Sequence, residues 1–251
     1  MGTGLRQVVS RRVLARWTRL ADAAPTIPAG RLRPLRTLAV ELRARLDRLI
    51  ASADARLGSV TPAPVAAPLN TDWTWRPAAW IDPIRPATLG DVADKTAFGP
   101  EATVFHDAQN SNVLLRQTSA TSQDASTPFL VSVAAYRFDG TFLSMVFDLP
   151  EAATKGLNRR YVIRMVPVIE TEHPTEVFAR LNISHGPNTE QVVREVPMQA
   201  EDKAVEFDLA YTKLNEKRVD RLWLDFIIGQ PGMNRVTIHD LTFSRRPRAE
   251  L

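Results

Sequence analysis

A change in hydrophobic period near residue 100 constrains the fold of this chain more than any other feature. From there to about residue 247, apolar and polar residues alternate with a period of two, as they do along half-buried β-strands. Gly, Pro, Asn and Asp interrupt the alternation at short intervals, and no long helical segment lies between the runs. The predicted strands cover residues 103–106, 113–117, 129–136, 142–149, 161–169, 177–184, 191–196, 204–209, 221–228 and 236–243. So many short strands in succession predict an antiparallel β-sandwich, because parallel strands need long crossover connections.

The alternation also assigns faces within a strand. In residues 221–228, a period of two places Leu222, Leu224 and Phe226 on one side and Trp223 and Asp225 on the other. The aliphatic side is predicted to face the core. Trp223 is therefore predicted to lie on the less buried face.

Residues 1–57 carry a helical pattern instead. Apolar residues recur at intervals of three and four over residues 5–20 and again over residues 35–53, which is the period of one helical face. Residues 25–30 contain two prolines and a glycine and predict a turn, and Pro34 suits the first turn of the second helix. We therefore expect an antiparallel helical hairpin whose apolar stripes need a packing partner.

Composition separates the two parts of the chain. Residues 58–70 contain three prolines and no charged residue, which is typical of a linker. The sandwich is then predicted over residues 71–251, with a Trp-rich lead-in over residues 71–100. Residues 1–60 carry twelve Arg and four acidic residues, a net charge of +8, so the remainder of this +4 chain carries −4. A basic segment of this kind meets an anionic partner or packs on its acidic neighbour.

The C-terminal part resembles a known superfamily. Its segments RRYVIR, VFARLN, AVEFDL, LWLDF and VTIHDLTF, which lie between residues 159 and 243, resemble the strand order of galactose-binding-like jelly rolls. This resemblance implies a sandwich of jelly-roll type and a role in carbohydrate binding. The whole chain is also similar to a family of alphaproteobacterial proteins, a domain of unknown function, most closely over residues 207–219 and 242–251. That similarity implies a bacterial protein and no particular activity.

Several classes of protein are disfavoured by what the sequence lacks. It has no Cys, and therefore no disulfide, thiolate metal site or cysteine nucleophile. It has no apolar run long enough to cross a membrane, no phosphate loop and no nucleophile elbow. The first 30 residues lack the apolar segment of a secretory signal. We therefore expect no catalytic residues and a cytoplasmic protein.

Two groups of residues are candidates for binding a ligand. Flat indole rings stack on the C–H faces of sugars, and three tryptophans fall close together, although a proline-rich lead-in also uses such rings to cover an open face of a sandwich. The second group surrounds the turn at residues 186–187, where amides, an imidazole and a carboxylate can bind sugar hydroxyls. Turns are commonly polar without any ligand. The candidates are Trp73, Trp75, Trp80, Asn182, His185, Asn188, Glu190 and Gln191.

Metal binding has little support in the sequence. The four histidines lie on different segments, without a metal-binding spacing. We expect no cofactor, and the one candidate metal ligand is Asp240, for a structural calcium by analogy with jelly rolls. Acidic residues on several strands leave open the alternative of a carbohydrate-active enzyme that uses paired carboxylates on the concave sheet.

The arginines of the hairpin form a different kind of candidate site. Arg12, Arg16, Arg36 and Arg43 could dock on an anionic surface such as a membrane, which would place the protein at its periphery. Arginines are also good helix formers whose stems cover apolar surface, and the acidic sandwich offers them an internal partner. Nucleic acid is disfavoured, because the interleaved aromatic residues that stack on bases are lacking here.

Together these features predict a non-enzymatic binding or assembly protein. The sandwich would bind a glycan or a protein partner, and the hairpin would dock on an anionic surface or partner. The alternatives are the carbohydrate-active enzyme and a purely structural assembly protein. The oligomeric state does not follow from the sequence.

Overall fold

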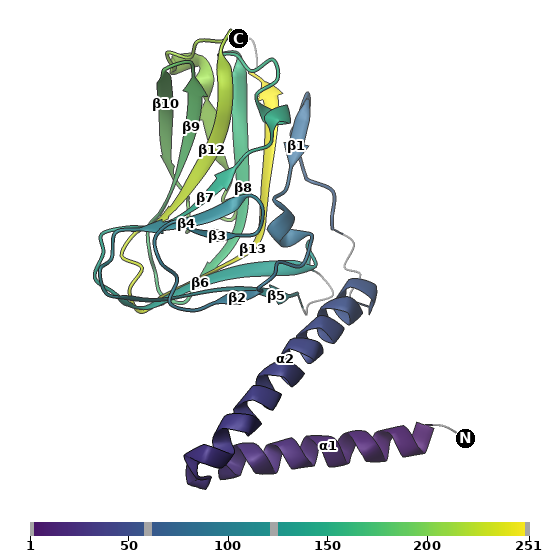
Figure 1. The fold of residues 1–251 in the computed structure, drawn as a ribbon. Coiled ribbons are helices and arrows are strands. Elements are labelled where there is room, and N and C mark those ends of the chain that lie inside the picture. Colours follow the sequence, from purple (N-terminus) through teal and green to yellow (C-terminus); the bar gives the residue numbers. More distant parts are fainter. Residues whose placement is uncertain (1–2, 58–61, 121–124, 249–251) are drawn as a thin grey trace. The chain divides into compact units, whose positions relative to one another are not determined.

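The computed structural model describes residues 3–57, 62–120 and 125–248 (Figure 1). The chain divides into two compact units, a helical unit up to Arg56 and a β-sheet unit from Leu57 onward. The helical unit contains α1 (Thr3–Ala23), the short 3-10 helix η1 (Ala24–Thr26) and α2 (Ala29–Leu57).

The second helix begins earlier than its hydrophobic pattern predicts. The carbonyl of Pro28 accepts hydrogen bonds from the amides of Arg31 and Leu32, so α2 starts at Ala29. Gly30 and Pro34 therefore lie inside the helix rather than at its start. Proline has no N–H to donate, and its position near the beginning of α2 limits the loss to one intrahelical hydrogen bond.

The apolar stripes of the helices are partly exposed, because Trp17, Leu20, Leu35 and Leu42 are half-buried whereas other members are open to solvent. Exposed fractions are 51% for Val13, 50% for Leu38 and 65% for Leu49. Within the described residues, no helix combines the length and the hydropathy that a membrane crossing requires. The helices are thus amphipathic elements whose apolar side chains remain accessible.

The β-sheet unit is a sandwich of two antiparallel sheets, of jelly-roll type (Figure 1). Sheet A has the strand order β11-β8-β13-β6-β5-β2, with β1 paired to β13, and sheet B has the order β10-β9-β12-β7-β4-β3. The strands are β1 (Trp73–Trp75), β2 (Thr88–Leu89), β3 (Thr96–Phe98), β4 (Ala102–His106), β5 (Ser111–Ser119), β6 (Phe129–Phe138), β7 (Leu143–Asp148), β8 (Tyr161–Thr171), β9 (Val177–His185), β10 (Asn188–Glu195), β11 (Val205–Asp208), β12 (Val219–Ile228) and β13 (Asn234–Pro247). The chain changes sheet repeatedly, as between β6 and β7 and between β12 and β13, so distant segments become neighbours.

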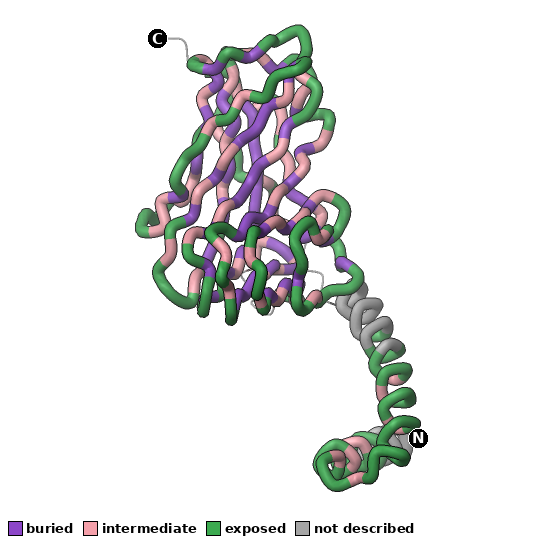
Figure 2. The backbone as a smooth tube through the Cα atoms, turned by 60° about the vertical axis from the view of Figure 1, so that its left-hand side comes forward, coloured by how far each residue is buried: buried purple, intermediate pink, exposed green. Residues whose placement is uncertain are grey.

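All ten predicted strands are present as β4 to β13, with ends shifted by up to four residues. The sequence pattern missed β1, β2 and β3, because strands of two or three residues are too short to display a period. The core lies between the sheets, along the buried stretches in Figure 2. Leu222, Leu224 and Phe226 are each fully buried there, whereas Trp223 is half-buried, as the alternation predicts.

The Trp-rich lead-in is fastened to β13 by two arginines. Arg76 forms a bidentate ion pair with Asp240, at 2.8 Å from Nε to Oδ1 and 2.9 Å from Nη2 to Oδ2, and both side chains are buried. Arg245 binds Asp72 in the same way, at 2.9 and 3.0 Å. Arg76 also donates to the carbonyl of Ala63 at 2.8 Å. The predicted linker is therefore attached to the sandwich at Ala63.

Trp80 completes this attachment. Its indole is fully buried and donates a hydrogen bond of 2.9 Å to the carbonyl of Ile238. The ring presents no face to a ligand, so the predicted stacking role is wrong for Trp80. Proline-flanked tryptophans here act as a cover for the core, because a large indole fills the open end of the sandwich.

We expect Asp240→Asn to destabilise the protein by about 3–5 kcal/mol, since it leaves the Arg76 guanidinium buried without its counter-charge. Urea unfolding of the full chain, followed by tryptophan fluorescence, measures the change. The matched control is Glu172→Gln, which removes an exposed ion pair with Arg235 at 3.7 Å and should cost less than about 1 kcal/mol. Equal losses in the two variants would show that the buried pair does not anchor the lead-in.

Candidate functional site

The outer surface of sheet B carries the most promising group of polar and aromatic side chains. Strand register places Gln191 of β10, Asn182 of β9, Trp223 of β12 and Asp148 of β7 in one row across the sheet. Directly opposed residues of antiparallel strands share a face, so all four side chains lie on the side away from the core. We call this surface, with the residues of the next row, the Trp223 face.

The next row of the Trp223 face contains a charged pair. Asp225 of β12 lies opposite Arg180 of β9. Arg180 donates from Nε to Oδ2 of Asp225 at 2.7 Å and makes a second contact through Nη2. Asp225 is 4% exposed, and Arg180 is half-buried. The pair is therefore rigid and leaves part of the guanidinium accessible.

Trp223 lies between this pair and a second one. Arg221 binds Asp148 through Nε at 3.0 Å and through Nη2, and its guanidinium lies 5.1 Å from the centre of the Trp223 ring. A cation at this distance from an indole ring is attracted by its π electrons. The indole is thus held in place on the outer surface of sheet B while remaining only half-buried.

The predicted polar cluster is divided by the structure. Gln191 donates to Oδ1 of Asn182 at 3.0 Å, and Asn182 itself is buried and donates to the carbonyl of Arg180 at 3.1 Å. These two predicted residues therefore belong to the Trp223 face. Gln191 is exposed and available, whereas Asn182 orients it from below.

His185, Asn188 and Glu190 lie on the opposite side of the same two strands. Asn188 lies opposite His185, and Glu190 lies opposite Ile183. These are the alternate positions of the two strands that face the core. His185 is buried and accepts a hydrogen bond from the amide of Asn215 at 3.3 Å. Asn182 and His185 are three positions apart on one strand. Successive side chains of a strand point to opposite faces, so these two cannot lie on the same face.

Trp73 and Trp75 belong to sheet A rather than to the Trp223 face. They lie on β1, opposite Arg245 and Phe243 of β13. Their ring centres are 6.5 Å apart, and the Trp75 ring is 5.4 Å from that of Phe243. Both are half-buried against the core, which makes them part of the covering lead-in.

Over residues 3–57, 62–120 and 125–248, no group of three or more His, Asp or Glu side chains has a geometry suited to a metal ion. Both oxygens of Asp240, the predicted calcium ligand, accept hydrogen bonds from Arg76, and Oδ2 also accepts one from Ser126 at 3.2 Å. The Asp240 carboxylate is thus committed to the anchor of the lead-in.

Sequence reasoning placed Trp223 on the exposed side but did not include it in the site. The signal available in the sequence was the position of Trp223 in the alternation of apolar and polar residues. Trp223 occupies a position of strand β12 where the alternation expects a polar residue, and an aromatic residue in such a position is a candidate for a surface contact. No local sequence pattern indicated Arg180, because its ion-pair partner Asp225 lies on a different strand.

The chain belongs to DUF6478, a family of unknown function, whose model matches residues 2–251. No curated protein matches it. Similar solved structures include the enzymatically active domain of tailspike protein 4 of bacteriophage CBA120, at 8% identity and a TM-score of 0.39. That match covers 57% of this chain and only 19% of the tailspike chain.

Two further solved structures are carbohydrate-binding modules. The family 11 module from Clostridium thermocellum, in complex with a β-1,3-1,4-mixed-linked tetrasaccharide, has 9% identity and a TM-score of 0.37, covering 65% of this chain and 98% of the module. The CBM22-1 xylan-binding domain from Paenibacillus barcinonensis Xyn10C has 10% identity and a TM-score of 0.37, covering 73% of this chain and all of that one.

The register of β12 predicts unequal losses of stability for substitutions of two neighbouring residues. Leu224→Ala should cost about 2–5 kcal/mol of unfolding free energy, because it opens a cavity in the core. Trp223→Ala removes a half-exposed ring and should cost about 1 kcal/mol. Chemical unfolding followed by circular dichroism gives both values. Similar losses for the two variants would contradict the assignment of Trp223 to the outer face.

Proposed function

We propose that this protein is a non-enzymatic glycan-binding protein. The Trp223 face holds the glycan, and the basic helices dock the protein on an anionic surface, at the periphery of a membrane. The observation that carries the glycan proposal is a half-buried indole on the outer surface of sheet B, with amide, guanidinium and carboxylate groups on the adjoining strands.

This combination matches the chemistry of a sugar. A pyranose ring offers an apolar face of C–H groups, which stacks on an aromatic ring, and a rim of hydroxyls, which need donors and acceptors in fixed directions. On the Trp223 face, Gln191 and the exposed parts of Arg221 and Asp148 supply those groups. The ion pairs fix their positions before a ligand arrives, so little conformational entropy is lost on binding.

The carboxylates of this face support binding rather than catalysis. A glycosidase needs two carboxyl groups that are free to act on opposite sides of one glycosidic bond. Asp148 and Asp225 are the acids on the two rows, and an arginine binds each of them. Hydrolysis would require those ion pairs to break first.

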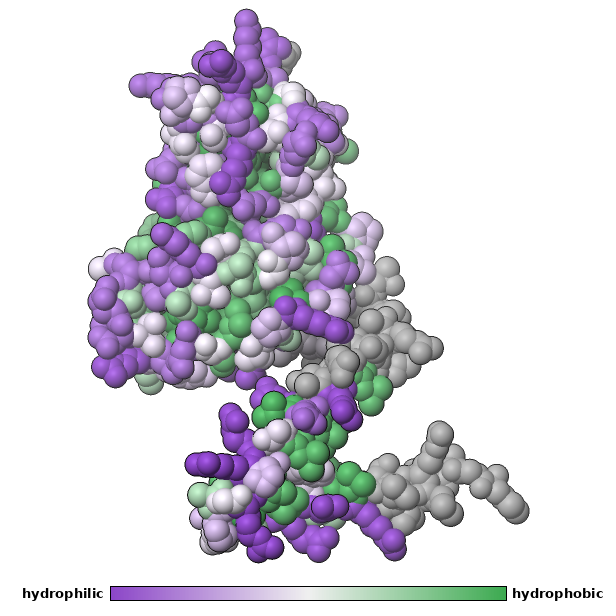
Figure 3. All heavy atoms as spheres, viewed as in Figure 1, coloured by the Kyte–Doolittle hydropathy of each residue, from purple (hydrophilic) through white to green (hydrophobic). Residues whose placement is uncertain are grey.

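The helical unit supports the docking proposal through the same side chains that were predicted for it. Arg12, Arg16, Arg36 and Arg43 are exposed. Figure 3 shows hydrophobic side chains next to hydrophilic ones on the helices, consistent with the exposed stripes. An amphipathic helix with arginines beside an open apolar stripe binds an anionic lipid surface through both charge and apolar burial.

Replacing Trp223 with Ala should reduce glycan binding at least tenfold, because the stacking platform is lost. The measurement is a glycan array with oligosaccharides of glucose, xylose and glucosamine, followed by calorimetric titration of the tightest ligand with the full chain. The matched control is Tyr136→Ala, which removes a 52% exposed aromatic residue from sheet A and should leave binding unchanged. Wild-type protein that binds no oligosaccharide would overturn the glycan proposal and favour a structural role.

The helices should bind vesicles rich in phosphatidylserine at low salt and ignore phosphatidylcholine vesicles. Changing Arg12, Arg16 and Arg36 to Gln should weaken co-sedimentation with the anionic vesicles several-fold, and added salt should weaken wild-type binding, because surface charge is screened. The matched control changes three exposed arginines of the sandwich, Arg85, Arg116 and Arg194, to Gln. Equal losses in both triple variants would contradict docking through the helices.

A further inference from the structure

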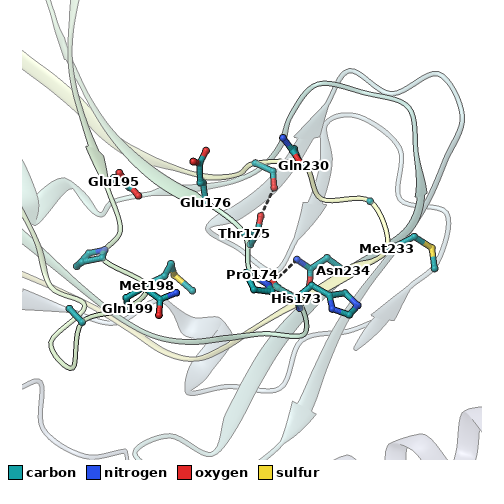
Figure 4. Close-up of a pocket in the computed structure, with 14 residues that line it drawn as sticks. His173, Pro174, Thr175, Glu176, Glu195, Met198, Gln199, Gln230, Met233 and Asn234 are labelled. Carbon is teal, nitrogen blue, oxygen red and sulfur yellow. Dashed lines mark hydrogen bonds between the residues drawn. The ribbon is translucent and has the colours of Figure 1, made fainter.

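A pocket of about 940 Å³ opens at one end of the sandwich, where three loops converge (Figure 4). The loops connect β8 to β9, β10 to β11 and β12 to β13. A pocket of this volume accommodates a ligand the size of a short oligosaccharide or peptide. Its polar and apolar lining includes Thr175, Glu176, Glu195, Met198, Gln199 and Gln230.

The walls of this end pocket are fixed by hydrogen bonds between the loops. Asn234 accepts from the amide of His173 at 2.9 Å and donates to its carbonyl at 3.0 Å. Thr175 donates through its hydroxyl to the carbonyl of Gly229, and Figure 4 shows both connections. The third wall is tied by the amide of Val196, which donates to the carbonyl of Val177 at 2.8 Å. The end pocket is therefore preformed.

Two carboxylates give the end pocket its charge. Glu195 lies opposite Phe178, and the Val196–Val177 hydrogen bond continues this register, so Glu176 lies diagonal to Glu195 on the same face. Figure 4 draws both carboxylates at the same end of the pocket. Neither glutamate forms an ion pair within the described part of the chain, and no Lys or Arg lines the pocket. Both glutamates are exposed, so a cationic ligand in the pocket has both carboxylates accessible to it.

Glu195 of the end pocket lies on the same side of sheet B as the Trp223 face. Along β10, Gln191, Val193 and Glu195 project on the same side of sheet B, because alternate residues share a face. Gln191 lies in the row of Trp223, and Glu195 lines the end pocket. Four residues of strand separate them, which is about 13 Å. One extended ligand can therefore reach both.

We propose that the glycan held on the Trp223 face contains an amino sugar, and that its free ammonium group is bound between Glu176 and Glu195 in the end pocket. This inference rests on the proposed glycan function. The ammonium group donates charge-assisted hydrogen bonds to the two carboxylates, Gln199 and Gln230 bind the neighbouring hydroxyls, and Met198 contacts the C–H groups of the ring. An N-acetylated sugar lacks the charge and leaves both carboxylates unpaired.

The test compares a glucosamine hexamer with the N-acetylglucosamine hexamer of the same length by calorimetric titration of the full chain. Wild-type protein should bind the glucosamine hexamer about tenfold more tightly, and salt should reduce this preference. The double variant Glu176→Gln with Glu195→Gln should lose the preference and keep its affinity for the acetylated hexamer. Glu201→Gln, an exposed glutamate outside the pocket, is the matched control and should keep the preference.

The outcomes separate this inference from the proposed function. If wild-type protein binds both hexamers equally, or the double variant keeps the preference, the amino-sugar assignment is overturned while glycan binding stands. If Trp223→Ala has no effect but the double variant does, the Trp223 face is wrong and the end pocket alone carries the ligand, which also overturns the proposal of one continuous site. If hexalysine competes with the bound glucosamine hexamer at a lower concentration than free glucosamine hexamer does, the pocket is a site for basic peptides. That outcome overturns the amino-sugar assignment.

Discussion

The buried ion pair between Arg76 and Asp240 is the interaction on which the rest of the sandwich depends. Two opposite charges in the interior are stable only as a bonded pair, so the lead-in must occupy one position along β13. That position brings Trp80 over the open end of the core and lets Trp73 and Trp75 pair with β13. A proline-rich segment without a long strand of its own thus becomes a fixed part of the sandwich.

With the core closed from that side, the outer surface of sheet B is left to form a site. Two ion pairs, Arg180 with Asp225 and Arg221 with Asp148, hold polar groups around the Trp223 indole, which lies outside the core. The same charges would be a cost in a buried position, but on a half-exposed sheet each pair keeps part of its hydration. The arrangement is suited to holding a ligand, and an arginine binds each of the two aspartates beside the indole.

Strand alternation explains both the success and the failure of residue-level prediction at this site. It placed Trp223 and Asp225 on one face and Leu224 on the other, which the register of β12 confirms. The same rule, applied to β9, would have separated Asn182 from His185. Grouping these two by proximity to a turn ignored the period of two, so one of them points outward and the other toward the core.

The sequence by itself determined the change of period between the two parts of the chain, the ten longer strands and the buried face of β12. It also determined the basic character of the helices, because all of these depend on local periodicity and composition. Only the tertiary structure decided which strands are neighbours. The contact of Arg76 with Asp240, the meeting of Arg180 with Asp225 and the end pocket all join residues far apart in the chain. Such pairings are selected by the packing of two sheets against each other, and no local pattern records them.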